Sequence, residues 1–283
     1  SNDSYIGFKG DEDLGDGMSA VWQLEEGVAF DTNGSTTTDV NGDTVTLSTF
    51  SPRQSFIGIA SDFGTVLGGN LLTPYRSATK RLDPFASTRA DFNAIIGSFP
   101  GVTGGAGLLN DESYTNNTLV YMSPDMNGFS ASLAYILADG STGNDTLAGR
   151  TSTTKDKNAY SLSASYANGP IFTTAAFESL NKFGLGATGK DVTAWKIGGS
   201  YTIKDTTTIG ALYENIDAGG TVGNRNAWSI SIDHQMGFTT LKAAYNVADN
   251  TSAANTGADQ FSLGISQALT KNTEVYALYT QVG

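Results

Sequence analysis

The sequence predicts an all-β protein, a transmembrane antiparallel up-and-down β-barrel. Three observations predict this fold. Apolar and polar residues alternate with a period of two along most of the chain, the connections between these segments are short and long in turn, and no apolar run approaches the roughly twenty residues of a helical membrane span. The 283 residues are 10% aromatic and only 16% charged, unlike a disordered chain. A closed barrel reaches this length as one unit, so we expect a single barrel domain over 1–283.

The alternation is clearest at 158–167, where Tyr160, Leu162 and Tyr166 are interleaved with serines. Successive side chains of a strand point to opposite faces, so each strand has one apolar face with aromatic ends and one face of Ser, Thr, Gly and a few charges. About fourteen segments show this pattern. The expected strands are 4–9, 18–26, 52–60, 64–70, 117–123, 128–138, 158–167, 171–179, 191–203, 206–215, 226–235, 238–248, 259–269 and 273–281.

The connections help to separate a membrane barrel from the alternative, a soluble β-sandwich. The short ones are 10–17, 61–63, 124–127, 168–170, 204–205, 236–237 and 270–272, and the long ones are 27–51, 71–116, 139–157, 180–190, 216–225 and 249–258. Outer-membrane barrels have short turns on one rim and long loops on the other. A sandwich would bury its apolar face, whereas here the aromatic strand ends fit headgroup-level girdles and the small polar face fits a water-filled lumen.

The strand count predicts that two further strands belong to the barrel. If the short turns lie at the periplasmic rim, strands 4–9 and 273–281 both leave their outer ends on the extracellular side. Bacterial single-chain barrels begin and end in the periplasm and have an even number of strands. We therefore expect one strand before Ser1 and one after Gly283, which makes about sixteen in the intact barrel.

The composition argues against several other classes of protein. The formal net charge of −12 argues against nucleic-acid binding. The absence of cysteine removes thiol chemistry, and the single histidine, His234, removes multi-histidine metal sites, so we expect no cofactor. Asp233 is adjacent to His234 in a strand and points to the opposite face, so it cannot orient that histidine as a catalytic triad requires. The sequence therefore predicts a protein that is not an enzyme.

Two glycine-rich motifs have structural interpretations. The run GLGATG at 184–189 spells the dinucleotide fingerprint, but an alternating strand follows where that fingerprint needs a helix N-terminus. Asp11, Asp13 and Asp16 suggest a calcium loop, but no Glu stands at the closing position. We expect a flexible loop at the first motif and a periplasmic turn at 10–17.

Seven blocks of sequence follow one another along the chain: SYIGFKG at 4–10, AVWQLE at 20–25, RQSFIG at 53–58, DFGTV at 62–66, TPY at 73–75, GFSAS at 128–132 and TEVYALYT at 273–280. In this order the blocks resemble the Gram-negative porin family, in particular the general porins of β-proteobacteria and Neisseria. The similarity runs over essentially the whole chain.

The resemblance implies a homotrimer of sixteen-stranded barrels in the outer membrane of a Gram-negative bacterium, surrounded by outer-membrane lipid and lipopolysaccharide. It implies a general porin, a passive diffusion channel for ions and small hydrophilic solutes, without catalysis, cofactor or nucleic acid. The third extracellular loop of such barrels folds into the lumen, and the long loop 71–116 falls in its place, with room for a short helix at 91–96. A structural or adhesive surface barrel without a transport role is the alternative.

The resemblance also implies where three copies would meet. The strands near 4–9, 52–60 and 64–70 are short and punctuated by glycine. We expect the trimer contact on these strands, near Phe56 or Ile59.

Charged residues that face the lumen are the candidate functional residues, because a charge in a membrane barrel costs much less free energy in the water-filled interior than on the lipid-facing side. By the alternation, the inward-pointing strand residues are Lys9, Glu178, Lys196, Glu214, Asp233 and Lys242. Loop 71–116 adds four cations, Arg76, Lys80, Arg81 and Arg89, and four acids, Asp83, Asp91, Asp111 and Glu112. Opposed charges across a narrow aqueous pore set its ion preference.

The ion preference follows from this charge balance and from the resemblance. Anion-preferring relatives carry arginines at three wall positions that are occupied here by Tyr5, Asn70 and Val120. Because these arginines are absent and the loop is balanced at four against four, we expect a weak cation preference caused by acidic outer loops. That preference should fade as salt shortens the Debye length from about 8 Å at physiological ionic strength.

Overall fold

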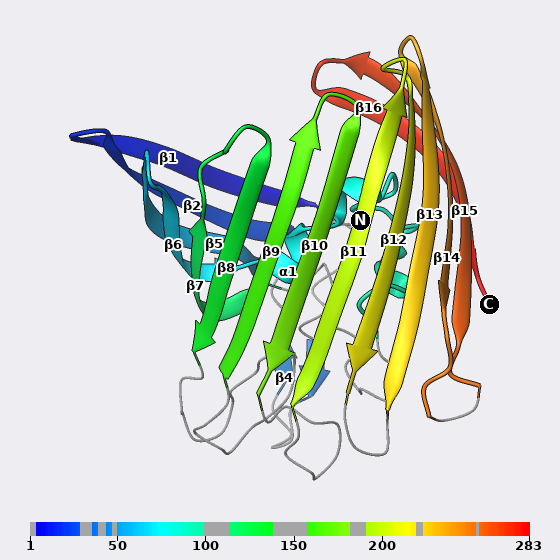
Figure 1. Cartoon of the computed structure of the whole chain (residues 1–283), viewed down its shortest axis with the longest axis horizontal. Coiled ribbons are helices and arrows are strands. Elements are labelled where there is room, and N and C mark those ends of the chain that lie inside the picture. Colours follow the sequence, from blue (N-terminus) through cyan, green and yellow to red (C-terminus); the bar gives the residue numbers. More distant parts are fainter. Residues whose placement is uncertain are drawn as a thin grey trace.

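The computed structural model describes residues 4–28, 36–38, 44–46, 50–98, 114–137, 158–181, 191–218, 223–252 and 255–283. Its main element is a fourteen-stranded antiparallel sheet in which every strand is hydrogen bonded to the next one along the chain. Figure 1 shows that this sheet curves around an interior. Within the described residues the first and last strands, β1 and β16, are not paired with each other, so the sheet is open between them.

The strands of the large sheet are β1 (Tyr5–Gly15), β2 (Met18–Val28), β5 (Phe50–Ser61), β6 (Gly64–Leu71), β7 (Thr115–Met122), β8 (Phe129–Leu137), β9 (Asn158–Asn168), β10 (Ile171–Leu180), β11 (Val192–Ile203), β12 (Thr207–Asp217), β13 (Asn224–Met236), β14 (Thr239–Ala248), β15 (Ala258–Thr270) and β16 (Thr273–Val282). Each expected segment corresponds to one of these strands. The all-β, up-and-down architecture predicted from the alternation is therefore confirmed.

The first hairpin differs from the expectation. Strand β1 continues to Gly15, so most of the segment expected as a turn at 10–17 is extended backbone that pairs with β2, Asp11 opposite Val21. Backbone pairing needs no apolar side chain, so the acidic run does not end the strand. The chain reverses where Asp16 and Gly17 adopt positive φ angles of 51° and 72°.

A second difference lies in the connection expected at 27–51. It contains a small separate hairpin, β3 (Thr36–Thr38) and β4 (Thr44–Thr46), that was not predicted. Threonine and valine favour extended backbone. Strands of three residues are too short for an alternation to be recognised in the sequence.

The outer face of the sheet is apolar and exposed, as a lipid-facing surface is. Aromatic rings gather on it near the strand ends that lead into the long connections, with centroid distances of 5.0, 5.4 and 5.7 Å for Tyr135 with Tyr160, Trp195 with Tyr213, and Trp228 with Tyr245. At the short-turn end, Phe129 lies 4.4 Å from Tyr166. Two aromatic bands at opposite ends of the strands match the girdles of outer-membrane barrels.

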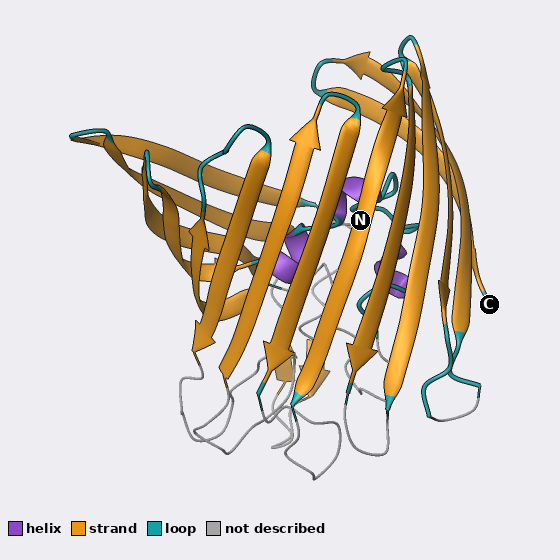
Figure 2. Ribbon diagram, viewed as in Figure 1, coloured by secondary structure: helices purple, strands orange, loops and turns teal. Residues whose placement is uncertain are grey.

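The inner face of the sheet carries the segment that follows β6. This segment contains three short helices, α1 (Pro74–Ser77), η1 (Lys80–Leu82) and η2 (Phe92–Ala94). Figure 2 shows them within the curve of the sheet. The helical turn expected at 91–96 is confirmed by η2, whereas α1 and η1 were not predicted. No described helix is long and apolar enough to cross a membrane.

Candidate functional site

The described part of loop 71–116 lies along the inner wall and is hydrogen bonded to it at several strands. Ser161 on β9 accepts a hydrogen bond from the Tyr75 amide at 2.8 Å, and Ser231 on β13 donates one to the Leu82 carbonyl at 3.0 Å. Gln260 on β15 donates one to the Asp91 carbonyl at 3.3 Å. The loop therefore crosses the inner face from β9 to β15.

Glu214 on β12 holds two distant points of the loop. Its carboxylate accepts hydrogen bonds from the Tyr75 hydroxyl at 2.7 Å and from the Gly97 amide at 2.7 Å. Lys196 lies opposite Glu214 in the register of β11 and β12, and its ammonium is 4.3 Å from the centre of the Tyr75 ring. Each of these groups has an oppositely charged or polar partner, as buried polar groups require.

The predicted inward residues fall into two groups in the structure. Glu178, Lys196 and Glu214 are buried beneath the loop. Asp233 and Lys242 lie opposite each other on β13 and β14 and are partly exposed, and Lys9 on the inner face of β1 is exposed. The first group therefore contacts the loop, and the second group faces the space beside it.

The positive charges of the loop differ in their exposure. Arg76 is buried over the wall near Glu178, which its charge attracts. Lys80, Arg81 and Arg89 are exposed, and the Arg81 guanidinium lies 4.7 Å from the centre of the Phe172 ring of β10. The acids Asp111 and Glu112 lie outside the described residues.

The two described loop acids point into the loop. Asp83 is buried and accepts hydrogen bonds from the Phe85 amide at 2.8 Å and the Phe92 amide at 2.9 Å. Asp91 accepts two more, from the amides of Ser87 and Asn93, both at 2.9 Å. These carboxylates satisfy backbone donors in tight turns, which is a common role of aspartate.

Asp83 and Asp91 also face each other. Burial raises the pKa of Asp83 well above its usual range, and the charge of Asp91 raises this pKa further. Burial also raises the pKa of Asp91. Two neighbouring carboxyl groups in a dry place favour a shared proton, because two adjacent charges repel. The loop acids therefore contribute less negative charge to the lumen than their number suggests.

One functional residue was missed by the sequence reasoning. Arg225 on β13 is buried on the inner wall and donates a hydrogen bond to the carbonyl of Ser98 in the loop. The strand was expected to begin at residue 226, whereas β13 begins at Asn224. Extending the alternation of Ala227 and Asp233 backward by one inward position would have found this arginine.

Part of the wall under the loop is apolar, with alanines beside larger residues such as Ile136, Val192 and Ile216, which the sequence reasoning did not predict. Tyr75 packs on Ala159, Ala176 and Ala194, and Leu82 packs near Ala227. Small inward side chains leave room for a second layer. Apolar residues at inward positions of the strands are the sequence signal for this part of the covered area.

A curved up-and-down sheet with an apolar outer face, a small polar inner face and a loop attached to the inner wall defines an outer-membrane β-barrel. The sequence model of the Gram-negative porin family matches residues 1–283, so the chain belongs to that family. The outer membrane of a Gram-negative bacterium is therefore its location.

Two curated relatives are neisserial major outer membrane proteins. The chain is 33% identical to major outer membrane protein P.IA of Neisseria meningitidis serogroup B strain MC58 over 133 residues, which cover 47% of this chain and 28% of that protein. It is 33% identical to major outer membrane protein P.IB of Neisseria gonorrhoeae over 141 residues, 50% of this chain and 34% of that protein. The matched part thus spans about a third of these relatives' length.

Solved structures show the same fold at lower identity. The anion-selective porin from Comamonas acidovorans superposes with a TM-score of 0.76 at 22% identity, covering 100% of this chain and 80% of that one. OmpF of Salmonella typhi, in complex with daunomycin, gives 0.74 at 13% identity, covering 98% and 81%. The trimer form of OmpT from Vibrio cholerae gives 0.68 at 16% identity, covering 99% and 80%.

Proposed function

We propose that this protein is a general porin, a single barrel domain through which ions and small hydrophilic solutes diffuse passively, without catalysis. The attachment of the loop to the inner wall is the observation that carries this proposal. A loop held by Ser161, Glu214 and Gln260 packs in apolar clusters against one side of the interior and narrows the polar space that remains beside it. A wall-bound constriction suits a permanently open channel.

A planar-bilayer recording tests the proposal. Refolded protein should insert in discrete steps of equal, large conductance, and vesicles that contain it should become permeable to small sugars. Correctly folded barrels that leave the bilayer conductance at the lipid baseline would contradict it. The alternative, a structural or adhesive surface barrel, would be favoured by that result.

The ion preference stays a prediction, and the geometry changes its expected sign in the narrow region. A balance of four cations against four acids assumes that all eight loop side chains are equally exposed to the lumen. Among the described residues of the loop, however, Lys80, Arg81 and Arg89 are exposed while Asp83 and Asp91 are occupied within the loop. We expect anions to be favoured at the constriction, and cations at acidic parts of the rims.

We further propose that the protein is a homotrimer, surrounded by lipid and lipopolysaccharide, with sixteen strands in the intact barrel. The trimer form of the Vibrio cholerae structure supports this assembly. The outward residues Ile57 and Ile59 of β5 are 68% and 43% exposed and suit a contact between copies. Phe56 does not, because it points inward and packs against the cluster of Leu67 and Val120.

A further inference from the structure

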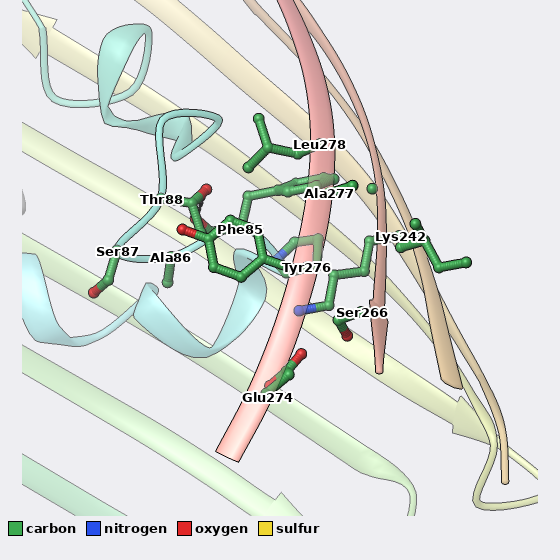
Figure 3. Close-up of a pocket in the computed structure, with 13 residues that line it drawn as sticks. Phe85, Ala86, Ser87, Thr88, Lys242, Ser266, Glu274, Tyr276, Ala277 and Leu278 are labelled. Carbon is green, nitrogen blue, oxygen red and sulfur yellow. Dashed lines mark hydrogen bonds between the residues drawn. The ribbon is translucent and has the colours of Figure 1, made fainter. Parts of the chain in front are cut away.

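A glycine on the inner face of β15 lies directly against an aromatic side chain of the loop. Gly264 on β15 faces inward beneath Phe85, and a Cβ atom at Gly264 would lie 2.7 Å from Cε1 of that ring. Real Cβ atoms do not come so close to another carbon. Figure 3 shows the Phe85 ring between its own loop segment and the strand that carries Ala277 and Leu278. No residue larger than glycine fits at this position while the ring keeps its place.

Small and apolar neighbours complete a recess around the ring, which we call the Phe85 socket: Gly264 as its floor, with Ala244 of β14 and Leu278 of β16 beside it. Ala90 of the loop packs against the same cluster, and Phe85 itself is only 2% exposed. A ring so enclosed cannot turn aside freely, because protein interiors are closely packed. A shift of the ring must therefore be transmitted to the loop backbone.

A second recess lies on the inner face of β11, with β12, β13 and β14 between it and β15. Gly198 on β11 faces Leu82, and a Cβ atom there would lie 2.5 Å from Cδ1 of that leucine. Asp83 stands between the two anchoring side chains and fixes the turn that carries them, through its hydrogen bond from the Phe85 amide. The two recesses therefore hold one rigid turn at two points.

We propose that Gly264, assisted by Gly198, is a positioning residue that sets how far the loop projects into the lumen. This inference rests on the proposed porin function. Beside the docked turn lies a cavity of about 260 Å³ lined by residues that include Lys242 and Glu274. The depth of the turn determines the cross-section that remains on this side, and it also places the exposed cation Arg89.

Gly264→Ala is the direct test, because among the described residues only the ring of Phe85 lies within 3.5 Å of the added methyl. Gly198→Ala is less clean, since its methyl would also meet the Ala211 carbonyl oxygen at 2.9 Å. Leu263→Ala on the same strand is the matched control, because Leu263 neighbours Gly264 but points outward, is 46% exposed and lies on the face away from the loop. Native gels should first show that both variants keep the oligomeric state of the wild type.

We expect Gly264→Ala to lose single-channel conductance and to shift the reversal potential under a salt gradient, while Leu263→Ala behaves like the wild type. A loss of strand stability alone would not move the reversal potential. The inference is overturned if Gly264→Ala has wild-type conductance and reversal potential, or if Leu263→Ala changes both equally.

A double-mutant cycle with Phe85→Ala tests whether Gly264 acts on the loop through the Phe85 ring. If Gly264 acts through the ring, adding Gly264→Ala to Phe85→Ala changes nothing further, because the ring that it would displace is gone. A full additional effect in that background contradicts the inference. If Gly264→Ala does not fold, Phe85→Ala alone decides: a released turn gives altered conductance with more current noise, and an unchanged trace overturns the proposal. A wild type without any conductance would instead refute the porin function.

Discussion

The Tyr75 hydroxyl donates a hydrogen bond of 2.7 Å to Oε2 of Glu214, and both side chains are fully buried between loop and wall. The other carboxylate oxygen accepts from the Gly97 amide. One wall residue thus joins the beginning of the loop to a point more than twenty residues later. Its removal should release both points together.

Glu214→Gln should therefore destabilise the docked loop. Glutamine offers one acceptor oxygen where the carboxylate offers two, so either Tyr75 or Gly97 loses its partner, at a cost of about 1–3 kcal/mol. Lys196 also loses the negative charge opposite it on β12, which leaves the buried Glu178 as its acidic neighbour. We expect noisier single-channel currents and easier thermal unfolding.

Tyr75→Phe is the control for this prediction, because it removes only one hydrogen bond, worth about 0.5–1.5 kcal/mol, and keeps the ring beneath Lys196. Its effect should be clearly smaller than that of Glu214→Gln. Equal effects of the two variants would show that the carboxylate charge and the Gly97 contact contribute nothing.

The paired acids of the loop predict a pH dependence. Burial raises the pKa of Asp83 and of Asp91 in the docked loop, so the docked state binds a proton more tightly than a released loop does. The stability of the docked loop is therefore greatest below the ordinary aspartate pKa, and it falls as pH rises toward the raised pKa of Asp83. Lys80 moderates the loss, because its charge favours ionised Asp91.

Current noise recorded across acid to neutral pH measures this effect. Noise should increase with rising pH in the wild type. Asp83→Asn should flatten the dependence of noise on pH, because asparagine does not titrate. It also loses one of the two hydrogen bonds that Asp83 accepts from the backbone amides of Phe85 and Phe92. Noise that instead increases toward acid pH would contradict the assignment of a shared proton.

The strands were predictable from sequence because their signal is local. Inward placement of Glu178 and Lys196 follows from the period of two alone. Their burial was not predictable in the same way, because it depends on where the loop lies, and the contact of Tyr75 with Glu214 joins residues 139 positions apart. The roles of Asp83 and Asp91 likewise depend on amides that a charge count ignores.

The proposed trimer contact predicts a difference between two outward isoleucine pairs. Ile57→Ala and Ile59→Ala on β5 should lower the temperature at which the trimer dissociates, because contacts between copies in a membrane depend on close van der Waals packing. Ile230→Ala and Ile232→Ala on β13, which are similarly exposed, should leave it unchanged. Semi-native gels after stepwise heating measure this temperature. The contact does not lie on β5 if all four variants dissociate at the wild-type temperature.

The exposed loop cations predict the ion preference of the pore. Arg81→Gln and Arg89→Gln should each shift the reversal potential toward that of a cation-selective pore, because each removes an exposed positive charge of the loop. Lys271→Gln in the exposed turn between β15 and β16 removes the same charge away from the loop and should have little effect.

At about 1 M salt, where the Debye length is about 3 Å, the rims are screened but a cation in the narrow region still acts on a passing ion. Anion preference that persists at this salt and falls in the two arginine variants supports a cationic constriction. A cation preference that fades with salt and is unaffected by either arginine would instead support control by the acidic outer loops.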